Sequence, residues 1–418
     1  MSRPSVAERA RQTGRLLRRE GPSGVAVRLL ARATEALDPP GYGSLPVSRE
    51  DLARASEIAA MGRVPPELLP WRSGEPLRVA WVCGPAGEGS GGHTTMFRMV
   101  AALERAGHDC TLYVNDRHGW EIDQHRRTIR AWWPWVEAEV RDLAAGIDDA
   151  HVVFATSWET AYPVLASPAK GVRCYFVQDF EPSFHPAGSI ALLAEATYRF
   201  GFHGVTAGRW LAQLLRRDYG MPADHFDFGV DRDCYAFEDA GERSGVCWFC
   251  RPSTPRRAHE LVVVALDLFA ARHPEVEIHT YGERPRDLPF AVTDHGLLAP
   301  AQLGALYRRC IAGIVLSATN VSLVPHEMLA CGCIPVVNEA EHNRLVLDND
   351  QVAYAWATPF ALAEALSRLV SVPRRQREAA AKSAAGSVET ISWEESGAQV
   401  ERILLAAVAA RTPKELVT

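Results

Sequence analysis

Two successive series of short apolar runs, each alternating with helical patterns, restrict what this chain can fold into more than any other feature. The first series has strand patterns at 78–83, 110–114, 151–155, 172–177 and 204–206. The second has strand patterns at 246–250, 276–281, 291–294, 312–316 and 334–337, with helical patterns at 256–271, 300–310 and 325–330. Such alternation is typical of parallel sheets with helices on both faces. The sequence therefore predicts an α/β fold of two doubly wound, Rossmann-like domains with a cleft between them.

Shifts in this pattern divide the chain into four segments. Residues 1–70 form a helical, Arg-rich extension and linker, and residues 71–235 form the first Rossmann-like domain. Residues 236–388 form the second Rossmann-like domain, and residues 389–418 a C-terminal helix. The extension interleaves leucine and valine with arginine, which leaves two interpretations open. It is either an amphipathic basic helix pair on an anionic membrane surface or a packed segment with solvated arginines.

Composition excludes several classes of protein. At 418 residues the chain is too long for one ordinary core, and 47% hydrophobic with 23% charged residues is typical of a globular protein. A formal net charge of −6 argues against a general nucleic-acid binder. The nine cysteines follow no extracellular spacing pattern and no secretory signal precedes them, so we expect a cytoplasmic protein with reduced thiols. No apolar run approaches the roughly 20 residues that cross a bilayer, so any membrane contact is expected to be peripheral.

The stretch Leu316–Val337 predicts a strand, a polar loop, a short helix and a second strand. Glu327 lies in the first turn of that helix, where unpaired backbone N–H groups attract anions. A carboxylate there suits a hydroxylated group such as a ribose rather than a phosphate. The turn therefore fits both ends of a nucleoside diphosphate. The alternative is a helix whose first-turn Glu only complements the helix dipole.

Basic residues follow another predicted strand, where the chain reads RPSTPRR from Arg251 to Arg257. Arg251 is at the strand end, and Arg256 and Arg257 come after a Pro-bounded loop. Arginines spaced in this way can clamp a diphosphate and neutralise a leaving group without a metal ion. A cation at a helix start opposes the helix dipole, which favours a binding role over a solvated loop.

Two stretches of the first domain are further candidates. The glycine-rich loop from Gly84 to Gly92 lies between a strand and a helix, where backbone N–H groups can approach a ligand. Gln178, Asp179 and Glu181 follow the strand at 172–177, at the sheet edge where α/β proteins place their chemistry. The piece WWPW at 132–135 is instead predicted to be core and helix-capping contact.

Metal sites are not favoured. Asp231 and Asp233 stand two residues apart, as do Asp348 and Asp350, but acidic loop residues are common. The cysteines at 247 and 250 fall within a predicted strand, so their side chains point to opposite faces and belong to the core. We therefore expect no bound metal.

Together these residues resemble glycosyltransferase family 4, whose members have the GT-B fold. The similarity is closest to the WsaF-type rhamnosyltransferases of that family. The segments that carry it are GGHTTMF, YFVQDFEPSFHPAG, RPSTPRRA and NVSLVPHEMLACGCIPVV. It covers the chain from Leu77 to the end. The resemblance implies that the first domain holds the acceptor, that the second holds the nucleotide-sugar, and that the last helix crosses back onto the first domain.

The resemblance also implies roles for single residues. Glu327 matches the second Glu of the family's E-x7-E motif, which holds the ribose, whereas Thr319 stands in place of the first Glu. Arg251 matches the catalytic Arg on the diphosphate, and Arg256 replaces a Lys. Asp179 takes the acidic position that faces the acceptor, and Gln178 and Glu181 beside it are the other expected acceptor residues. The other implied donor-site residues are Gly91, Gly92, Asn320, Ser322 and His93, the last of which equally fits a helix cap.

The activity that the resemblance implies is sugar transfer, retaining and independent of metal ions or other cofactors. The donor would be a dTDP-linked deoxyhexose such as rhamnose, and the acceptor a saccharide or lipid-linked glycan. Asp179 would orient the acceptor hydroxyl or take its proton. Three alternatives stay open: a GT-B nucleotide-sugar epimerase, an NAD-dependent oxidoreductase that uses the glycine-rich loop, and a non-catalytic scaffold held at the membrane by the Arg-rich extension.

Overall fold

The computed structural model describes residues 45–60, 67–87, 89–238 and 241–411. Most of the Arg-rich extension predicted for residues 1–70 lies outside these ranges, and of its helices the structure describes α2 (Arg49–Ala60). From Ala53 onward the chain forms one compact unit. Within the described ranges, none of the helices combines the length and the apolar character that a membrane span needs.

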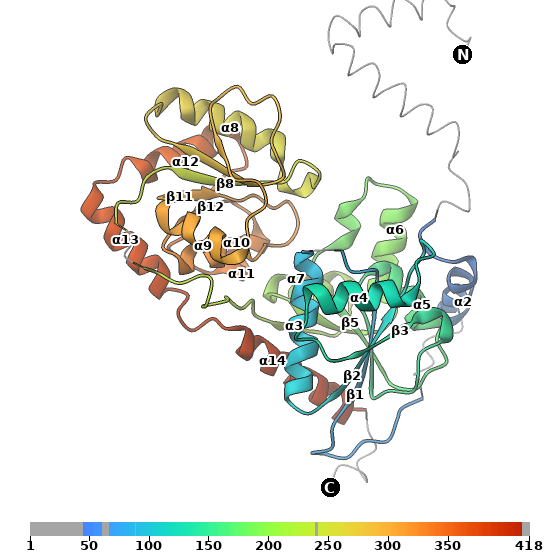
Figure 1. Ribbon diagram of the computed structural model, residues 1–418. Helices are drawn as coiled ribbons and strands as arrows, with labels where there is room; N and C mark the ends of the chain where they lie inside the picture. Colours follow the sequence, from blue (N-terminus) through green and yellow to red (C-terminus); the bar gives the residue numbers. More distant parts are fainter. Residues whose placement is uncertain (1–44, 61–66, 88, 239–240, 412–418) are drawn as a thin grey trace, which may run out of the picture. The chain divides into compact units, whose positions relative to one another are not determined.

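The first sheet is entirely parallel and, in the part of the chain described, has seven strands in the order β3-β2-β1-β4-β5-β6-β7. The strands are β1 (Arg78–Cys83), β2 (Asp109–Val114), β3 (Glu139–Asp142), β4 (Val152–Ala155), β5 (Val172–Val177), β6 (His203–Ala207) and β7 (Ala223–Phe226). The longer helices between them are α3 (Gly91–Arg105), α4 (Ile122–Trp132), α5 (Trp158–Ala166), α6 (Ser189–Ala196) and α7 (Arg209–Tyr219) (Figure 1). The strand order reverses between β1 and β4, which makes this a doubly wound sheet.

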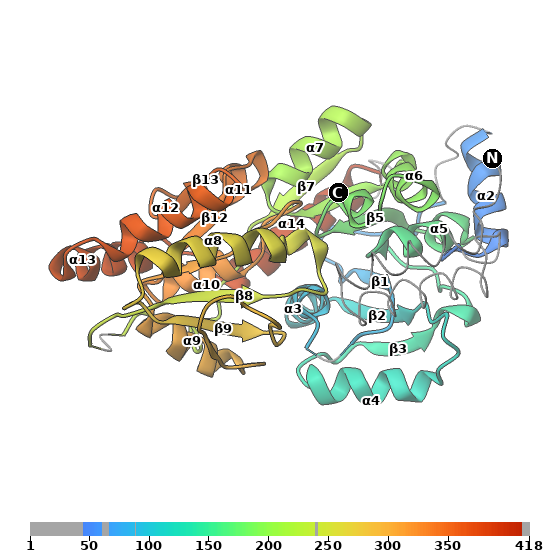
Figure 2. The same ribbon diagram turned by 90° about the horizontal axis from the view of Figure 1, so that it is seen from above.

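The second sheet repeats this plan with six strands among the described residues, in the order β10-β9-β8-β11-β12-β13 and all parallel. The strands are β8 (Val246–Cys250), β9 (Ile278–Gly282), β10 (Thr293–Asp294), β11 (Ala312–Ile314), β12 (Ile334–Asn338) and β13 (Ala353–Ala355). The helices are α8 (His259–Arg272), α9 (Pro300–Arg309), α10 (Val324–Ala330), α11 (Glu341–Leu347), α12 (Pro359–Val370) and α13 (Arg374–Gly386) (Figure 2). Here the order reverses between β8 and β11. The predicted pair of doubly wound sheets is therefore confirmed.

The last helix, α14 (Trp393–Ala409), packs against α3 and against β7 of the first sheet. A Cβ atom on Gly397 would lie 2.4 Å from the Cβ atom of Ala102, so a glycine is needed where α14 meets α3. Ser396 Oγ donates a hydrogen bond to Asp227 O at 2.7 Å, and His108 Nε2 lies 3.1 Å from a carboxylate oxygen of Glu401. The last described helix, α14, thus packs on the first sheet although it follows the second in the sequence (Figure 1).

The structure departs from the predicted elements at sheet edges and at one helix start. The sequence patterns predict no strand for β3, β7 or β13, and each of these is a short edge strand. An edge strand is partly solvated and carries polar residues, which hides the apolar pattern of buried strands. The helix predicted at 256–271 begins only at His259, because Pro255–Arg257 form a 3₁₀ turn and Ala258 adopts a φ of 50°.

Candidate active site

The candidate site is built on the point where the second sheet reverses its strand order. The loop after β8 carries Arg251 to Arg257, and the loop after β11 carries the residues that lead into α10. Because β8 and β11 are parallel neighbours, both loops leave the same sheet edge side by side. Ala318 N donates to Arg256 O at 2.9 Å, which ties the two loops together. Topology alone therefore brings the basic loop to the segment that contains Glu327.

Three guanidinium groups meet in the first of these loops. Arg251 Nε lies 3.0 Å from a carboxylate oxygen of Glu283. Arg256 Nε lies 3.4 Å from Oδ2 of Asp179, and its guanidinium sits over the ring of Phe184 at 4.4 Å. These two cations thus each have a carboxylate partner.

The third guanidinium, that of Arg257, forms no ion pair with a carboxylate of the described residues, although the charge of Asp179 acts on it. Its Nη1 atom is buried without a hydrogen-bond partner. Burial, and after it the charge of Arg256, lowers the pKa of Arg257 to about 10, which leaves it protonated at neutral pH. A buried cation without a partner is costly and is found where a ligand supplies the missing charge. Arg257 was part of the basic loop in the sequence but was not among the residues assigned to the site, because burial cannot be seen in a sequence.

Unpaired polar atoms are concentrated in the same two loops. Apart from Nε of Arg251 and of Arg256, which lie against carboxylates, nine buried side-chain N or O atoms of the described residues have no hydrogen-bond partner, and five of them belong to positions 257 or 319–326. In the second of these segments they are Thr319 Oγ1, Asn320 Oδ1, Ser322 Oγ and His326 Nδ1. Buried polar atoms are nearly always hydrogen-bonded, so such a group indicates a site for a ligand rich in oxygen atoms. Thr319, where the family motif has a Glu, is itself 3% exposed.

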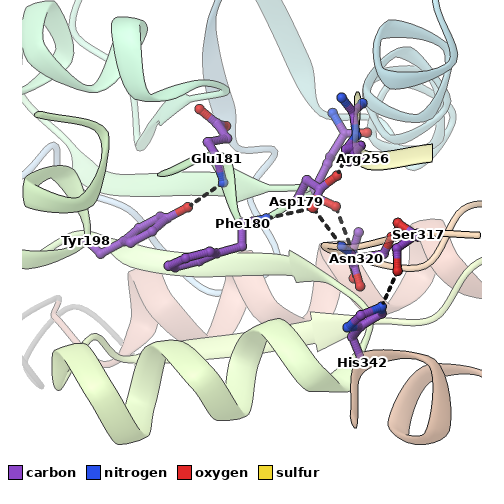
Figure 3. A network of polar contacts seen from close by, with 10 residues as sticks. Asp179, Phe180, Glu181, Tyr198, Arg256, Ser317, Asn320 and His342 are labelled. Carbon is purple, nitrogen blue, oxygen red and sulfur yellow. Dashed lines mark hydrogen bonds and ion pairs between the residues drawn. The ribbon is translucent and has the colours of Figure 1, made fainter. Parts of the chain in front are cut away.

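Asp179 and Asn320 join the two sheets (Figure 3). Asp179 Oδ1 accepts hydrogen bonds from the backbone N–H groups of Phe180 and Asn320, both at 2.8 Å. Asn320 Nδ2 in turn donates to Gln178 O at 2.9 Å and to Ala207 O at 3.0 Å. With Arg256 on its other oxygen, the Asp179 carboxylate holds both loops of the second sheet at the carboxyl end of β5. Sequence reasoning placed Asp179 with the acceptor, and these contacts add a positioning role.

The two other residues predicted to face the acceptor lie in different surroundings. The side-chain amide of Gln178 lies beside Gly92, at 3.8 Å from the position of a Cβ atom there. Glu181 is buried, and its Oε2 accepts a hydrogen bond from Trp158 N at the start of α5 at 2.7 Å. Burial raises the pKa of Glu181 to about 8. In Figure 3 its carboxyl group points away from Asp179 and Asn320, so the structure brings Gln178 and Asp179 to the site and leaves Glu181 at a helix cap.

The glycine-rich loop is braced by His93. Its Nε2 lies 3.3 Å from Gly84 O and its Nδ1 lies 2.9 Å from Ser90 Oγ. A carbonyl can only accept, so Nε2 carries the proton and Nδ1 accepts from the Ser90 hydroxyl. Burial lowers the pKa of His93 and keeps the ring neutral. His93 thus contacts Ser90, the N-cap residue of α3, while Gly91 and Gly92 are exposed in the first turn of that helix.

Glu327 lies near groups of the first domain and of the connector. Burial raises the pKa of Glu327 to about 7; the charge of Arg98 lowers it and that of Asp231 raises it. Arg98 Nη2 is 3.3 Å from Oδ2 of Asp231, and its guanidinium lies 4.9 Å from the ring centre of Trp393. Asp231, one of the carboxylates considered above as a metal ligand, therefore pairs with an arginine. The described ranges contain no group of three His, Cys, Asp or Glu residues that could hold a metal ion.

The raised pKa of Glu327 predicts a pH-dependent stability. An acid whose folded-state pKa lies above its unfolded value stabilises the fold when protonated, fully below about 4.5, and loses this contribution as the pH rises through about 7. We expect Glu327→Gln to become more stable than the wild type by about 2 kcal/mol as the pH rises from 5 to 8. Thermal unfolding at several pH values measures this, with the exposed Glu394→Gln as the control. A stability difference that stays constant with pH would contradict it.

Comparison with solved structures identifies the class of fold: it is the two-domain GT-B fold of glycosyltransferases. HepE from Anabaena, solved with UDP and glucose, matches 79% of this chain and 100% of its own, with a TM-score of 0.62 and 11% identity. A TarM mutant from S. aureus, solved with fondaparinux, alpha-GlcNAc-glycerol and UDP, matches 78% of this chain and 99% of its own, with a TM-score of 0.64 and 7% identity. At these identities the similarity establishes the fold alone.

Sequence comparison finds one matching domain family and one similar curated protein. Residues 244–367 match the model of the WsaF C-terminal domain, and this segment contains Arg251, Arg257 and Glu327. The O-antigen biosynthesis protein RfbC of Myxococcus xanthus is 31% identical over 340 residues, which is 78% of this chain and 26% of that protein. The chain thus spans about a quarter of the length of this relative. The resemblance to WsaF is supported for the second domain, whereas family 4 and rhamnosyl specificity stay predictions.

Proposed function

We propose that this chain is a glycosyltransferase of polysaccharide biosynthesis that takes its sugar from a nucleoside diphosphate donor. The observation that carries the proposal is the group of three guanidinium ions at the switch point of the second sheet, with Nη1 of Arg257 buried and without a hydrogen-bond partner. A diphosphate supplies the missing negative charge, and sugar hydroxyls supply partners for the unpaired atoms of Thr319, Asn320 and Ser322. The GT-B fold and the similarity to RfbC support the same activity.

The finer proposal concerns the donor and the reaction. The donor is a dTDP-linked deoxyhexose such as rhamnose, with Glu327 on the sugar of the nucleoside. The acceptor is a saccharide or a lipid-linked glycan. Transfer retains the anomeric configuration and uses neither a metal ion nor another cofactor. The enzyme works in the cytoplasm, and its Arg-rich extension supplies peripheral contact with the membrane. The resemblance to WsaF, extended by the match of residues 244–367, supports this choice of donor.

In this reaction the bond between the anomeric carbon and the diphosphate oxygen breaks as the acceptor oxygen bonds to the same carbon. Negative charge grows on the diphosphate, and Arg251, Arg256 and Arg257 stabilise it without reorganising. The acceptor hydroxyl attacks on the face from which the diphosphate leaves and gives its proton to the departing oxygen. Asp179 holds Arg256 and the loop of Asn320 in register with this event.

Nucleotide binding tests the proposal directly. Thermal unfolding with dTDP, UDP, GDP and NAD is expected to show stabilisation by a nucleoside diphosphate, of about 2.7 kcal/mol at a hundredfold excess over Kd. Arg251→Ala should lower that affinity by about 1.5–3 kcal/mol and remove most transfer, because it deletes a charge-assisted contact. Arg375→Ala, which changes an exposed arginine on α13, is the control.

The results separate the alternatives. Stabilisation by NAD but by no nucleoside diphosphate would replace the proposal with an oxidoreductase. Conversion of a dTDP-sugar to an isomer without any acceptor would identify an epimerase. Binding of nucleotide with neither transfer nor isomerisation, for any dTDP- or UDP-sugar, would leave a non-catalytic scaffold.

A further inference from the structure

Three tryptophans around α4 are exposed to solvent. Trp120 is 54% exposed, Trp132 49% and Trp135 40%. The prediction that the WWPW piece belongs to the core is right for Trp133, which is 3% exposed. It is wrong for Trp132 and Trp135. Large exposed aromatic rings are a marker of binding surfaces, because leaving them in water is unfavourable.

The ring of Trp132 touches the glycine-rich loop. Its Cζ3 atom lies 3.9 Å from the position of a Cβ atom on Gly89, two residues before the first turn of α3. Trp133 anchors this piece of chain, because its Nε1 donates to Thr94 Oγ1 at 2.9 Å and its ring meets that of Phe97 edge-on at 4.9 Å. The anchored Trp133 therefore keeps this piece of chain, and with it Trp132, beside the loop that opens α3.

Trp120 is fixed at the other end of α4. Asp116 accepts a hydrogen bond from Trp120 N at 2.6 Å and pairs with His125 Nε2 at 3.2 Å. Arg117 of the same turn lies 3.9 Å from Glu159 in the first turn of α5, so this turn also sits near the carboxyl ends of the strands. The 11 residues of α4 span about 16 Å along the helix axis, with Trp132 at its last position and Trp120 two residues before its first. That spacing suits a chain of several units rather than a single small molecule.

The charges between the rings argue against a lipid surface. Arg126 pairs with Asp123 at 2.7 Å, and Arg130 donates to the carbonyl oxygen of Ala138 at 2.8 Å. Glu121 is exposed beside Trp120. The stretch 121–130 thus carries three arginines, including the exposed Arg127, against two carboxylates, a net charge of +1. The apolar parts of the surface are separate flat rings, whereas a membrane-bound helix presents a continuous apolar face and several free cations. Flat rings set among polar groups fit pyranose rings, which offer C–H faces and hydroxyl groups together.

Building on the proposed transferase function, we infer that Trp132 and Trp120 form a stacking surface along α4 for a glycan acceptor chain. Trp132 holds the sugar unit beside the glycine-rich loop, and Trp120 a unit farther from the transfer site. The ligand class is a linear oligosaccharide or polysaccharide, bound by the first domain.

The test uses the full chain and a panel of linear oligosaccharides of rhamnose, mannose and glucose, with binding measured by calorimetry. Trp132→Ala and Trp120→Ala should each weaken binding by about tenfold, as for an aromatic hot spot, while stabilisation by dTDP or UDP stays unchanged. Trp132→Phe keeps a stacking ring and should stay within about threefold of the wild type. Trp356→Ala, at a 71% exposed position between β13 and α12, is the matched control and should bind normally.

Three outcomes would overturn the inference: a wild-type protein that binds none of the panel, tryptophan variants that bind as the wild type does, and binding lost equally in Trp356→Ala. Sedimentation of the wild type, but not of Trp132→Ala, with vesicles of phosphatidylcholine and phosphatidylglycerol would also overturn it and would assign the surface to a membrane. Stabilisation by dTDP or UDP tests the proposed transferase function and does not depend on either tryptophan. Failure of the glycan-binding inference can therefore be told apart from failure of the proposed function.

Discussion

Replacing Arg257 with methionine is expected to make the ligand-free protein more stable while removing most of its affinity for nucleoside diphosphates. The guanidinium is buried with Nη1 unpaired, and burial lowers its pKa to about 10, so the charged form is disfavoured in the ligand-free fold. Removing that charge should stabilise the protein by about 2 kcal/mol. The lost contact with a diphosphate should weaken binding by about 1.5–3 kcal/mol. Thermal unfolding with and without dTDP or UDP measures both effects.

Arg251→Met is the comparison that makes this result interpretable. Arg251 has a carboxylate partner in Glu283 at 3.0 Å, so its loss should weaken nucleotide binding without raising the stability of the ligand-free protein. An Arg257 variant that is less stable than the wild type and responds normally to nucleotide would show that Arg257 serves the fold and not the ligand.

Replacing Asn320 with alanine is expected to destabilise the protein by about 2–3 kcal/mol. Asn320 is 1% exposed, and its Nδ2 satisfies the carbonyl oxygens of Gln178 and Ala207 in the first domain. Truncation would leave two buried acceptors unpaired, at about 1–3 kcal/mol each before water enters. Denaturant unfolding of the two proteins measures the loss. Transfer should fall as well, because the backbone of Asn320 shares the Asp179 carboxylate with Arg256.

Ser322→Ala is the matched control for Asn320. It removes a buried hydroxyl of the same loop that has no partner, so the ligand-free protein should be as stable as the wild type or more stable. Equal destabilisation by the two substitutions would mean that the loop is sensitive to any change. The contacts of Asn320 with the first domain would then carry no special weight.

The Arg257 and Ser322 variants both remove polar atoms that are buried and unpaired in the ligand-free site. Arg257, Thr319 and Ser322 leave buried polar atoms unpaired in the ligand-free fold, which lowers its stability. A ligand that satisfies these atoms regains that free energy on binding. Binding sites often contain buried polar atoms that a stable interior would avoid. Substitutions that remove such atoms are expected to stabilise the protein and to reduce its function.

Local pattern was enough to predict the architecture and part of the site. Buried parallel strands are continuous apolar runs, so β1, β5 and β8 could be read from the sequence, and their carboxyl ends located Asp179 and Arg251. The short edge strands β3, β7 and β13 could not be, because solvent on one side removes the apolar pattern. The helix after Arg257 was predicted too early, since nothing in the local pattern requires the φ of 50° at Ala258.

The amino-acid sequence by itself determined that two doubly wound sheets form and that basic and acidic residues gather at the carboxyl end of β8, β11 and β5. Only the tertiary structure decided which of those residues are paired. Glu283 and Asp179 pair with Arg251 and Arg256, and Nη1 of Arg257 is left without a hydrogen-bond partner. Trp132 is exposed, whereas Trp133, one position away, is buried. The reason is physical: apolar periodicity is a property of neighbouring residues, whereas the burial of a charge or a ring depends on loops that are distant in sequence and that only the assembled sheets bring together.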